Sequence, residues 1–307
     1  MTITVLTTRP LPLPELKLGG EPIRFAALGS GEGDGARALL ATALDPVDAA
    51  MIAALPGSVG LIANLGVGTD NIDLAAAVAR GIRVSNTPVV TEDTADQAFA
   101  LILATCRRTA QADRFVRSGG WEAGKPFAPG IRVHGARLGI AGFGAIGQAV
   151  ARRATGFGMQ VSYWARAARP EGDALGARYI AGLEQLVTES DIVSIHVPLT
   201  GDTHHLFDAA LLSQFKPGAV LVNTARGAVV DEAALVAALE SGVLGGAGLD
   251  VFEDEPRVHP GLLGIDSVVL APHAGSATQA CRADMAARVI GNLMRYLETG
   301  EPVDRVI

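Results

Sequence analysis

Apolar residues recur along the chain in short runs that alternate with segments of helical spacing. Short β-branched and aliphatic runs predict buried strands, whereas apolar residues three and four positions apart predict helices. The first part is predicted to form strands over residues 2–8, 24–28, 38–42, 60–65 and 82–85, and helices over 46–55 and 74–80. The second part is predicted to form strands over 138–141, 159–164, 191–197, 219–224, 246–252 and 267–271, and helices over 146–154, 206–215 and 231–240.

Two longer helices are predicted over residues 91–117 and 278–299. Strands that alternate with helices indicate an α/β fold in which right-handed crossovers build doubly wound parallel sheets. We expect two such domains. The substrate (catalytic) domain is predicted to combine residues 1–98 with 281–307, and a larger Rossmann dinucleotide-binding domain is predicted over 99–280, entered through the helix 91–117.

A glycine motif opens the second predicted domain. Gly142, Gly144 and Gly147 form G-x-G-x-x-G between a strand and a helix, with Ala145 and Ile146 inside the motif. The first glycine permits a tight turn, the second lets the backbone approach a pyrophosphate, and the third lets helix and strand pack closely. The N–H groups at the helix start favour an anion. The motif therefore predicts a dinucleotide site.

Composition narrows the class of protein. The 307 residues are 49% hydrophobic and 19% charged, which is typical of a globular protein. A net charge of −7 argues against nucleic-acid binding. The two cysteines cannot form a disulfide framework. We see neither a signal-peptide pattern nor an apolar stretch of membrane-spanning length, so we expect a cytoplasmic protein without membrane association.

Three residues that follow predicted strands carry candidate chemistry: Arg226, Glu255 and His273. Ligands of parallel sheets collect at the carboxyl ends of the strands. Arginine can bind a carboxylate with two hydrogen bonds, histidine can donate a proton, and a neighbouring carboxylate favours the charged imidazolium. Each residue also has a structural interpretation: a loop arginine, a solvated acidic loop or a histidine at a strand end. Together on one edge, they point to hydride transfer onto a carbonyl.

Two further features remain open at this level. The turn Gly66-Val67-Gly68 follows a strand and precedes a helix, so it is either an ordinary turn or a second place where backbone N–H groups hold an anion. His204 and His205 are adjacent, so we expect their side chains to point apart. No cysteine or carboxylate joins them at metal-ligand spacing, so we predict no metal site.

Several motifs in order closely resemble the D-isomer-specific 2-hydroxyacid dehydrogenases, most nearly their NADPH-dependent glyoxylate/hydroxypyruvate reductase branch. The resemblance covers almost the whole chain. It rests on NLGVGTDNID (64–73), RGIRVSNTP (80–88), GFGAIG (142–147), HVPLT (196–200), VNTARGAVVDEAAL (222–235), GLDVFEDEP (248–256) and APHAGSAT (271–278).

The resemblance implies reduction of a 2-oxo acid to a D-2-hydroxy acid by a nicotinamide cofactor. It assigns Arg226 to the substrate carboxylate, Glu255 to pairing with the histidine, and His273 to proton donation. It also implies that Val67 and Gly68 bind the carboxylate through backbone amides, together with Arg226 and His273. Cofactor contacts beyond the glycine motif are implied for Val197, Thr224, Ala225, Arg226, Asp250, His273 and Gly275.

The strand end after the glycine motif bears on the choice of cofactor. NAD enzymes usually carry an acid there, whereas this chain has Ala165 followed by Arg166. Arginine would bind a 2′-phosphate, so we predict NADP(H) in preference to NAD(H).

Other functions on the same scaffold compete with this interpretation. One alternative is a 2-keto-D-gluconate reductase or another D-2-hydroxyacid dehydrogenase. A second, of another class, is a non-catalytic NADP(H)-sensing module, against which the presence of Arg226, Glu255 and His273 argues. The resemblance further implies a homodimer built on the long connecting helix.

Overall fold

A computed structural model describes residues 3–307 and divides the chain into two compact units. The first unit comprises the chain up to Val90 together with Thr278–Ile307, and the second comprises Thr91–Ala277. The domain boundaries predicted at 98/99 and 280/281 lie inside helices, whereas the units divide at the starts of those helices. Among the described residues, no helix is long and apolar enough to cross a bilayer.

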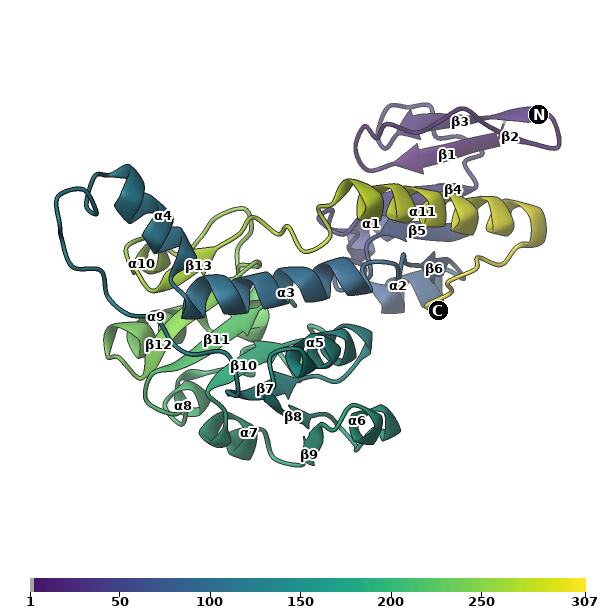
Figure 1. Ribbon diagram of the computed structural model, residues 1–307. Coiled ribbons are helices and arrows are strands. Elements are labelled where there is room, and N and C mark those ends of the chain that lie inside the picture. Colours follow the sequence, from purple (N-terminus) through teal and green to yellow (C-terminus); the bar gives the residue numbers. More distant parts are fainter. Residues whose placement is uncertain (1–2) are drawn as a thin grey trace. The chain divides into compact units, whose positions relative to one another are not determined.

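The first unit is built on a six-stranded sheet in the order β2-β3-β1-β4-β5-β6. All pairs are parallel except the antiparallel edge pair β2 and β3. The helix α11 lies on one face of this sheet (Figure 1). Its residues Val289, Leu293 and Tyr296 pack into the core there. The bounds are β1 Ile3–Thr7, β2 Leu16–Leu18, β3 Glu21–Ala27, β4 Ala38–Thr42, β5 Leu61–Leu65, β6 Arg83–Ser85, α1 Ala49–Ala54, α2 Leu74–Ala79 and α11 Gln279–Thr299. The fold class of this unit is as predicted. Position 2 of the predicted first strand lies outside the described residues.

Asp45 anchors the loop that follows β4. Its carboxylate accepts hydrogen bonds from the Thr8 hydroxyl, the Arg9 guanidinium, and both the backbone N–H and the hydroxyl of Thr42. Burial acts to raise the pKa of Asp45, but the hydrogen bonds from Arg9, Thr8 and Thr42 outweigh it and lower the pKa. The ionised carboxylate thus joins the ends of the neighbouring strands β1 and β4.

Replacing Asp45 by asparagine is expected to lower the free energy of unfolding by about 1–3 kcal/mol at neutral pH, because the donors of Thr8, Arg9 and Thr42 lose a charged acceptor. Because the pKa of Asp45 is lower in the folded protein than in the unfolded chain, its ionised carboxylate stabilises the fold. This stabilisation is complete above the unfolded aspartate pKa of about 3.9, and it is lost as the pH falls through the pKa of Asp45 in the folded protein. The difference in the free energy of unfolding between wild type and Asp45→Asn should therefore become smaller in acid. Urea unfolding across pH measures it, with the exposed Asp34→Asn as a control. A difference that becomes larger in acid would contradict the assignment.

The second unit contains a seven-stranded sheet in the order β13-β12-β11-β10-β7-β8-β9, parallel throughout. The strand order reverses between β7 and β10, as in a Rossmann fold. The helices α3 and α5 lie on one face of the sheet (Figure 1). Their apolar residues cover that face, and those of α7, α8 and α9 cover the other. The bounds are α3 Thr91–Cys106, α4 Thr109–Arg117, β7 Arg137–Ala141, α5 Ala145–Thr155, β8 Gln160–Trp164, α6 Pro170–Ala174, β9 Arg178–Ile180, α7 Leu183–Glu189, β10 Ile192–Ile195, α8 Ala209–Leu212, β11 Ala219–Asn223, the 3₁₀ helix η1 Gly227–Val229, α9 Glu232–Glu240, β12 Leu244–Leu249, α10 Pro260–Leu263 and β13 Val268–Leu270.

The prediction of one continuous helix over 91–117 is wrong. Arg108 has a left-handed φ of 54°, which separates α3 from α4. Two tertiary contacts explain the break. The Cys106 carbonyl accepts the Ile131 N–H at 2.7 Å, and the Arg108 guanidinium reaches Asp266 at 3.2 Å.

The helix predicted over 206–215 is also shorter than expected. Phe207 pairs as an isolated bridge with Val230, and its N–H donates to the Val229 carbonyl at 3.0 Å. The Asp208 side chain then caps α8 by accepting the Leu211 N–H. The bridge ties this segment to the chain that follows β11, close to the residues of the candidate site.

Candidate active site

Three adjacent strands of the second unit deliver the predicted catalytic residues to one edge of the sheet. Arg226 follows β11, Glu255 follows β12 and His273 follows β13. Because these strands are parallel neighbours, their carboxyl ends lie side by side. The structure therefore brings together residues that are distant in the sequence.

His273 and Glu255 form a direct pair. The His273 Nδ1 lies 2.8 Å from Glu255 Oε2, and both side chains are about one-quarter to one-third exposed, at 32% and 24%. His273 has a left-handed φ of 54°, and its N–H donates to the carbonyls of Asp250 and Ala271. With Nδ1 bound to a carboxylate, Nε2 is the ring nitrogen left to exchange a proton with a substrate.

Glu255 is held in its ionised form. Burial acts to raise its pKa, but the hydrogen bond from His273, the backbone N–H of Phe252 and the charge of Arg226 outweigh burial and lower it. The Phe252 N–H donates to Oε1 at 3.0 Å, so each carboxylate oxygen has a fixed partner. An ionised carboxylate in this position stabilises a protonated His273.

Arg226 lies in a turn that is held by contacts which no pattern in the sequence predicts. The buried Asn223 side chain accepts the Ala225 N–H at 3.0 Å and donates to the Arg226 carbonyl at 2.9 Å. The next residue, Gly227, packs against the backbone of Phe252, where an added Cβ would lie 1.8 Å from the Phe252 carbonyl carbon. Only glycine lets the Arg226 turn approach the Glu255 segment this closely. The pattern of apolar residues does not predict this contact between Gly227 and Phe252.

Asp250 organises the turn that carries His273. Its side chain is buried, and its two oxygens accept the N–H groups of Ala274 and Gly275, each at 2.7 Å. Gln97 donates to the same carboxylate at 3.4 Å. Burial raises the pKa of Asp250. The carboxylate of Asp250 and the N–H of Gly275 are thus hydrogen-bonded to each other within the protein. The contacts of Asp250 and Gly275 with the cofactor remain a prediction.

The glycine motif has the shape that a pyrophosphate requires. Gly142 has φ 99°, and a Cβ there would lie 2.6 Å from the His196 carbonyl, while a Cβ at Gly147 would lie 2.2 Å from the Gly142 carbonyl. Gly144, by contrast, faces open space, since an added Cβ would meet no atom within 4 Å. Gly144 is also the N-cap of α5, which no side chain caps, and Ala145 and Ile146 begin the helix. These residues fit a dinucleotide phosphate.

The remaining predicted cofactor contacts lie on the same edge of this sheet. Val197 follows β10 and is buried next to the Gly142 turn. Thr224 and Ala225 follow β11, and the buried Thr224 hydroxyl has no hydrogen-bond partner within residues 3–307. Arg166 is exposed in a bend after β8, the strand beside β7. An orphaned hydroxyl and an exposed arginine are both suited to contact a bound polar ligand.

The glycine turn of the first unit has a defined backbone arrangement. The carbonyls of Gly66, Val67 and Gly68 accept hydrogen bonds from the Thr87 N–H and from the Asn86 and Asn64 amides, at 2.8–2.9 Å. In a trans peptide the N–H points opposite to the preceding carbonyl. The N–H groups of residues 67–69 therefore point away from the Thr87, Asn86 and Asn64 donors.

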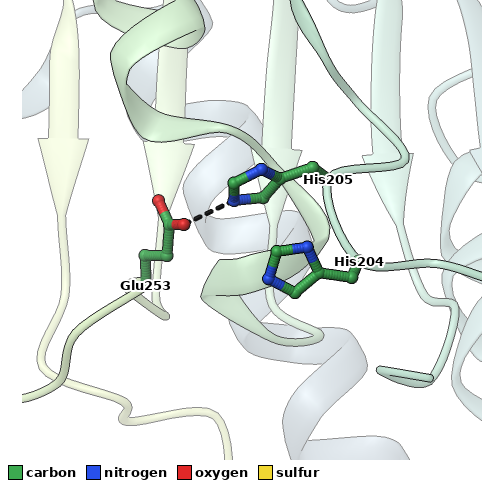
Figure 2. Close-up of side chains that lie close together, drawn as sticks. All are labelled: His204, His205 and Glu253. Atoms are coloured by element: carbon green, nitrogen blue, oxygen red, sulfur yellow. Dashed lines mark hydrogen bonds and ion pairs between the residues drawn. The ribbon is translucent and has the colours of Figure 1, made fainter. Parts of the chain in front are cut away.

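The expectation that His204 and His205 point apart is wrong. His205 has a left-handed φ of 50°, and the two ring centroids lie 4.1 Å apart. Figure 2 shows both rings extending toward Glu253, whose carboxylate pairs with His205 Nε2. The carboxylate comes from the chain after β12, so sequence spacing could not reveal it.

A separate cavity of about 560 Å³ lies at the opposite edge of the second sheet. Arg132, Asp191 and Lys216 line it near the amino ends of β7, β10 and β11. It contains none of the predicted catalytic residues, which all lie at the carboxyl ends.

Comparisons with known proteins agree with this geometry. The family model described as D-isomer specific 2-hydroxyacid dehydrogenase, NAD binding domain, matches residues 99–275. The chain is 47% identical to a glyoxylate reductase of Thermococcus litoralis over 88% of this chain and 83% of that protein. It is 42% identical to a hydroxyphenylpyruvate reductase of Plectranthus scutellarioides over 87% of this chain and 84% of that protein. The NADPH-dependent glyoxylate/hydroxypyruvate reductase of Sinorhizobium meliloti, solved in complex with NADP and malonate, has a TM-score of 0.89 at 34% identity, covering 99% of this chain and 96% of that chain.

Proposed function

The chain belongs to the D-isomer specific 2-hydroxyacid dehydrogenases, which are NAD(P)-dependent oxidoreductases, and we propose that it reduces glyoxylate, hydroxypyruvate or a close relative to the D-2-hydroxy acid. One observation carries this proposal above the others. His273 after β13 pairs with Glu255 after β12, and Arg226 follows β11, the strand on the other side of β12. A proton donor and a carboxylate-binding cation are what reduction of a 2-oxo acid requires.

The proposed mechanism assigns one task to each side chain. Arg226 binds the substrate carboxylate and polarises the neighbouring carbonyl. Glu255, ionised because of its lowered pKa, stabilises the imidazolium of His273. His273 Nε2 then donates its proton to the carbonyl oxygen, so that the oxygen becomes the hydroxyl of the product. The reduced nicotinamide supplies the hydride to the carbonyl carbon when the cofactor is bound.

Other residues are proposed to hold the two ligands. The glycine turn at Gly142–Gly147 would hold the pyrophosphate, because Gly144 faces open space and α5 has no side-chain cap. Thr224, whose buried hydroxyl lacks a hydrogen-bond partner in the described part of the chain, is a proposed cofactor contact. In the first unit, the backbone N–H groups of Val67 and Gly68 are proposed to bind a carboxylate.

A panel of 2-oxo acids tests the substrate proposal. Oxidation of NADPH, followed by its absorbance, should be fastest with glyoxylate or hydroxypyruvate. A preference for 2-keto-D-gluconate or for an aromatic 2-oxo acid would move the protein to another branch of the family. Absence of turnover with every acid would instead favour a cofactor-sensing module.

We also propose that the enzyme prefers NADP(H). Arg166 is exposed immediately beyond β8, next to the strand that leads into the glycine turn, and no carboxylate precedes it at Ala165. An arginine binds a 2′-phosphate through charge-assisted hydrogen bonds worth about 1.5–3 kcal/mol.

Replacing Arg166 by alanine is therefore expected to raise the KM for NADPH about ten- to a hundredfold and to leave the KM for NADH nearly unchanged. Steady-state kinetics with each cofactor measure this difference. Arg137→Ala is the matched control, because that arginine lies at the amino end of β7, on the opposite edge of the same sheet. A wild type that uses NADH and NADPH equally well would refute the preference.

We further propose that the protein works in the cytoplasm as a homodimer. The second unit exposes Trp121 and Phe127 in the loop after α4, with 73% and 40% of their surfaces accessible, which suits a surface covered by another chain. The mass in solution decides this point, since a particle of one 31.5 kDa chain would contradict a dimer.

A further inference from the structure

His204, His205 and Glu253 form a cluster of metal-ligating side chains outside the proposed catalytic set. One ligand atom from each lies within 4.8 Å of the other two. Figure 2 shows the two imidazole rings on the same side of their segment, facing the carboxylate. The cluster is accessible, since His204 and Glu253 are exposed and His205 is half-buried.

The backbone holds two of these ligands in place. The left-handed φ of His205 is uncommon for a residue with a side chain, and it turns the ring of His205 toward that of His204. The His205 N–H donates to the Ala228 carbonyl at 2.8 Å, which fixes this conformation. Glu253 is oriented from the other side, because its Oε2 accepts the Glu232 N–H at 3.4 Å and its own N–H donates to Glu232 Oε1 at 2.9 Å.

We propose that His204, His205 and Glu253 bind a divalent transition-metal cation of the Zn²⁺ class. Two imidazoles and one carboxylate suit Zn²⁺, Co²⁺ or Ni²⁺, whereas Mg²⁺ and Ca²⁺ prefer all-oxygen sites. Three protein ligands leave the fourth tetrahedral position to water. Glu232 would act as an outer partner that orients the ligating carboxylate.

Only a small adjustment is needed to seat the ion. Ligand bonds of about 2.0–2.1 Å place tetrahedral ligand atoms about 3.4 Å apart. His205 and Glu253 are already in direct contact, and the ion would replace the hydrogen between them. His204, being exposed, can close the remaining gap by rotation of its side chain.

The cluster adjoins the proposed catalytic loops. The carbonyl that fixes His205 belongs to Ala228, two residues after Arg226, and Glu253 precedes Glu255 by two residues. A bound ion would therefore tie the segment that carries Glu255 to the 204–205 segment, which is hydrogen-bonded to Ala228. It would also stabilise the folded chain, because the unfolded chain lacks the assembled site.

Zn²⁺ titration of the cofactor-free full-length protein, followed by calorimetry, tests the proposal. We expect one tight site per chain in the wild type, and binding at least tenfold weaker in His204→Ala and in Glu253→Gln. Two control variants remove other histidines: His134→Ala, on the opposite edge of the sheet, and His273→Ala, in the proposed catalytic pair. Both should keep the tight site.

A second measurement guards against loss of folding. Saturating Zn²⁺ should raise the Tm of the wild type and of His134→Ala by more than that of His204→Ala, with equal Tm values before the metal is added. Absence of a tight site, equal affinity in His204→Ala, or loss of the site in His273→Ala would each overturn the proposal. The last result would assign the ion to the catalytic pair instead.

Discussion

Replacement of His273 by alanine is expected to lower kcat for 2-oxo acid reduction by about 10²–10⁴, the range that positioned proton donors contribute. The carbonyl oxygen gains negative charge as the hydride arrives, and without His273 its proton must come from water. Glu255 also loses its 2.8 Å partner in this variant. Steady-state turnover of NADPH with glyoxylate measures the loss.

The control separates chemistry from binding. NADPH affinity, followed by nucleotide fluorescence, should fall far less than kcat, because the glycine turn at Gly142–Gly147, the proposed pyrophosphate site, is carried by a different part of the sheet. His134→Ala, at the amino edge, should retain full kcat. An undiminished kcat in His273→Ala would show that another group donates the proton.

Replacement of Gly227 by alanine is expected to damage both stability and activity. The added Cβ would lie 1.8 Å from the carbonyl carbon of Phe252 and 2.3 Å from the backbone nitrogen of Glu253. Backbone cannot rotate aside as a side chain can, so the Arg226 turn and the Glu255 segment must separate. We expect about 3 kcal/mol or more of destabilisation, at the upper end for overpacking, and a fall in kcat/KM of about a hundredfold or more.

Thermal unfolding and steady-state kinetics measure the two effects. Gly264→Ala is a suitable control in the same unit, because a Cβ there would meet no atom within 4 Å and its φ is −92°. We expect that variant to behave nearly as the wild type. A Gly227→Ala protein with unchanged Tm and kcat/KM would mean that the two loops are not held at this spacing.

The elements that the sequence predicts well are those whose signals are local. Buried parallel strands appear as apolar runs, and Gly142, Gly144 and Gly147 mark the strand-to-helix turn by their spacing. Arg226 and His273 could be proposed as partners because parallel neighbouring strands carry their carboxyl ends to one edge. The edge strands β2 and β9 were missed, since three residues are too few to show alternation.

Features that depend on distant contacts could not be predicted in the same way. The break at Arg108 follows from contacts with Asp266 and from the chain that returns to the end of α3. The requirement for glycine at position 227 arises only from the approach of Phe252. His205 has a positive φ although it is not a glycine, so the sequence does not predict that its ring turns toward His204.

The bend at Arg166 bears on how such an enzyme diversifies. Arg166 is exposed beyond β8, whereas Arg226, Glu255 and His273 follow β11, β12 and β13, where Gly227 packs against the backbone of Phe252. On the proposed role of Arg166, a substitution in this bend alone would change the preference between NADPH and NADH. If Arg166 binds the 2′-phosphate as proposed, the choice of electron donor and the proposed substrate chemistry lie on separable parts of one sheet, and descendants of this chain could exchange the first while conserving the second.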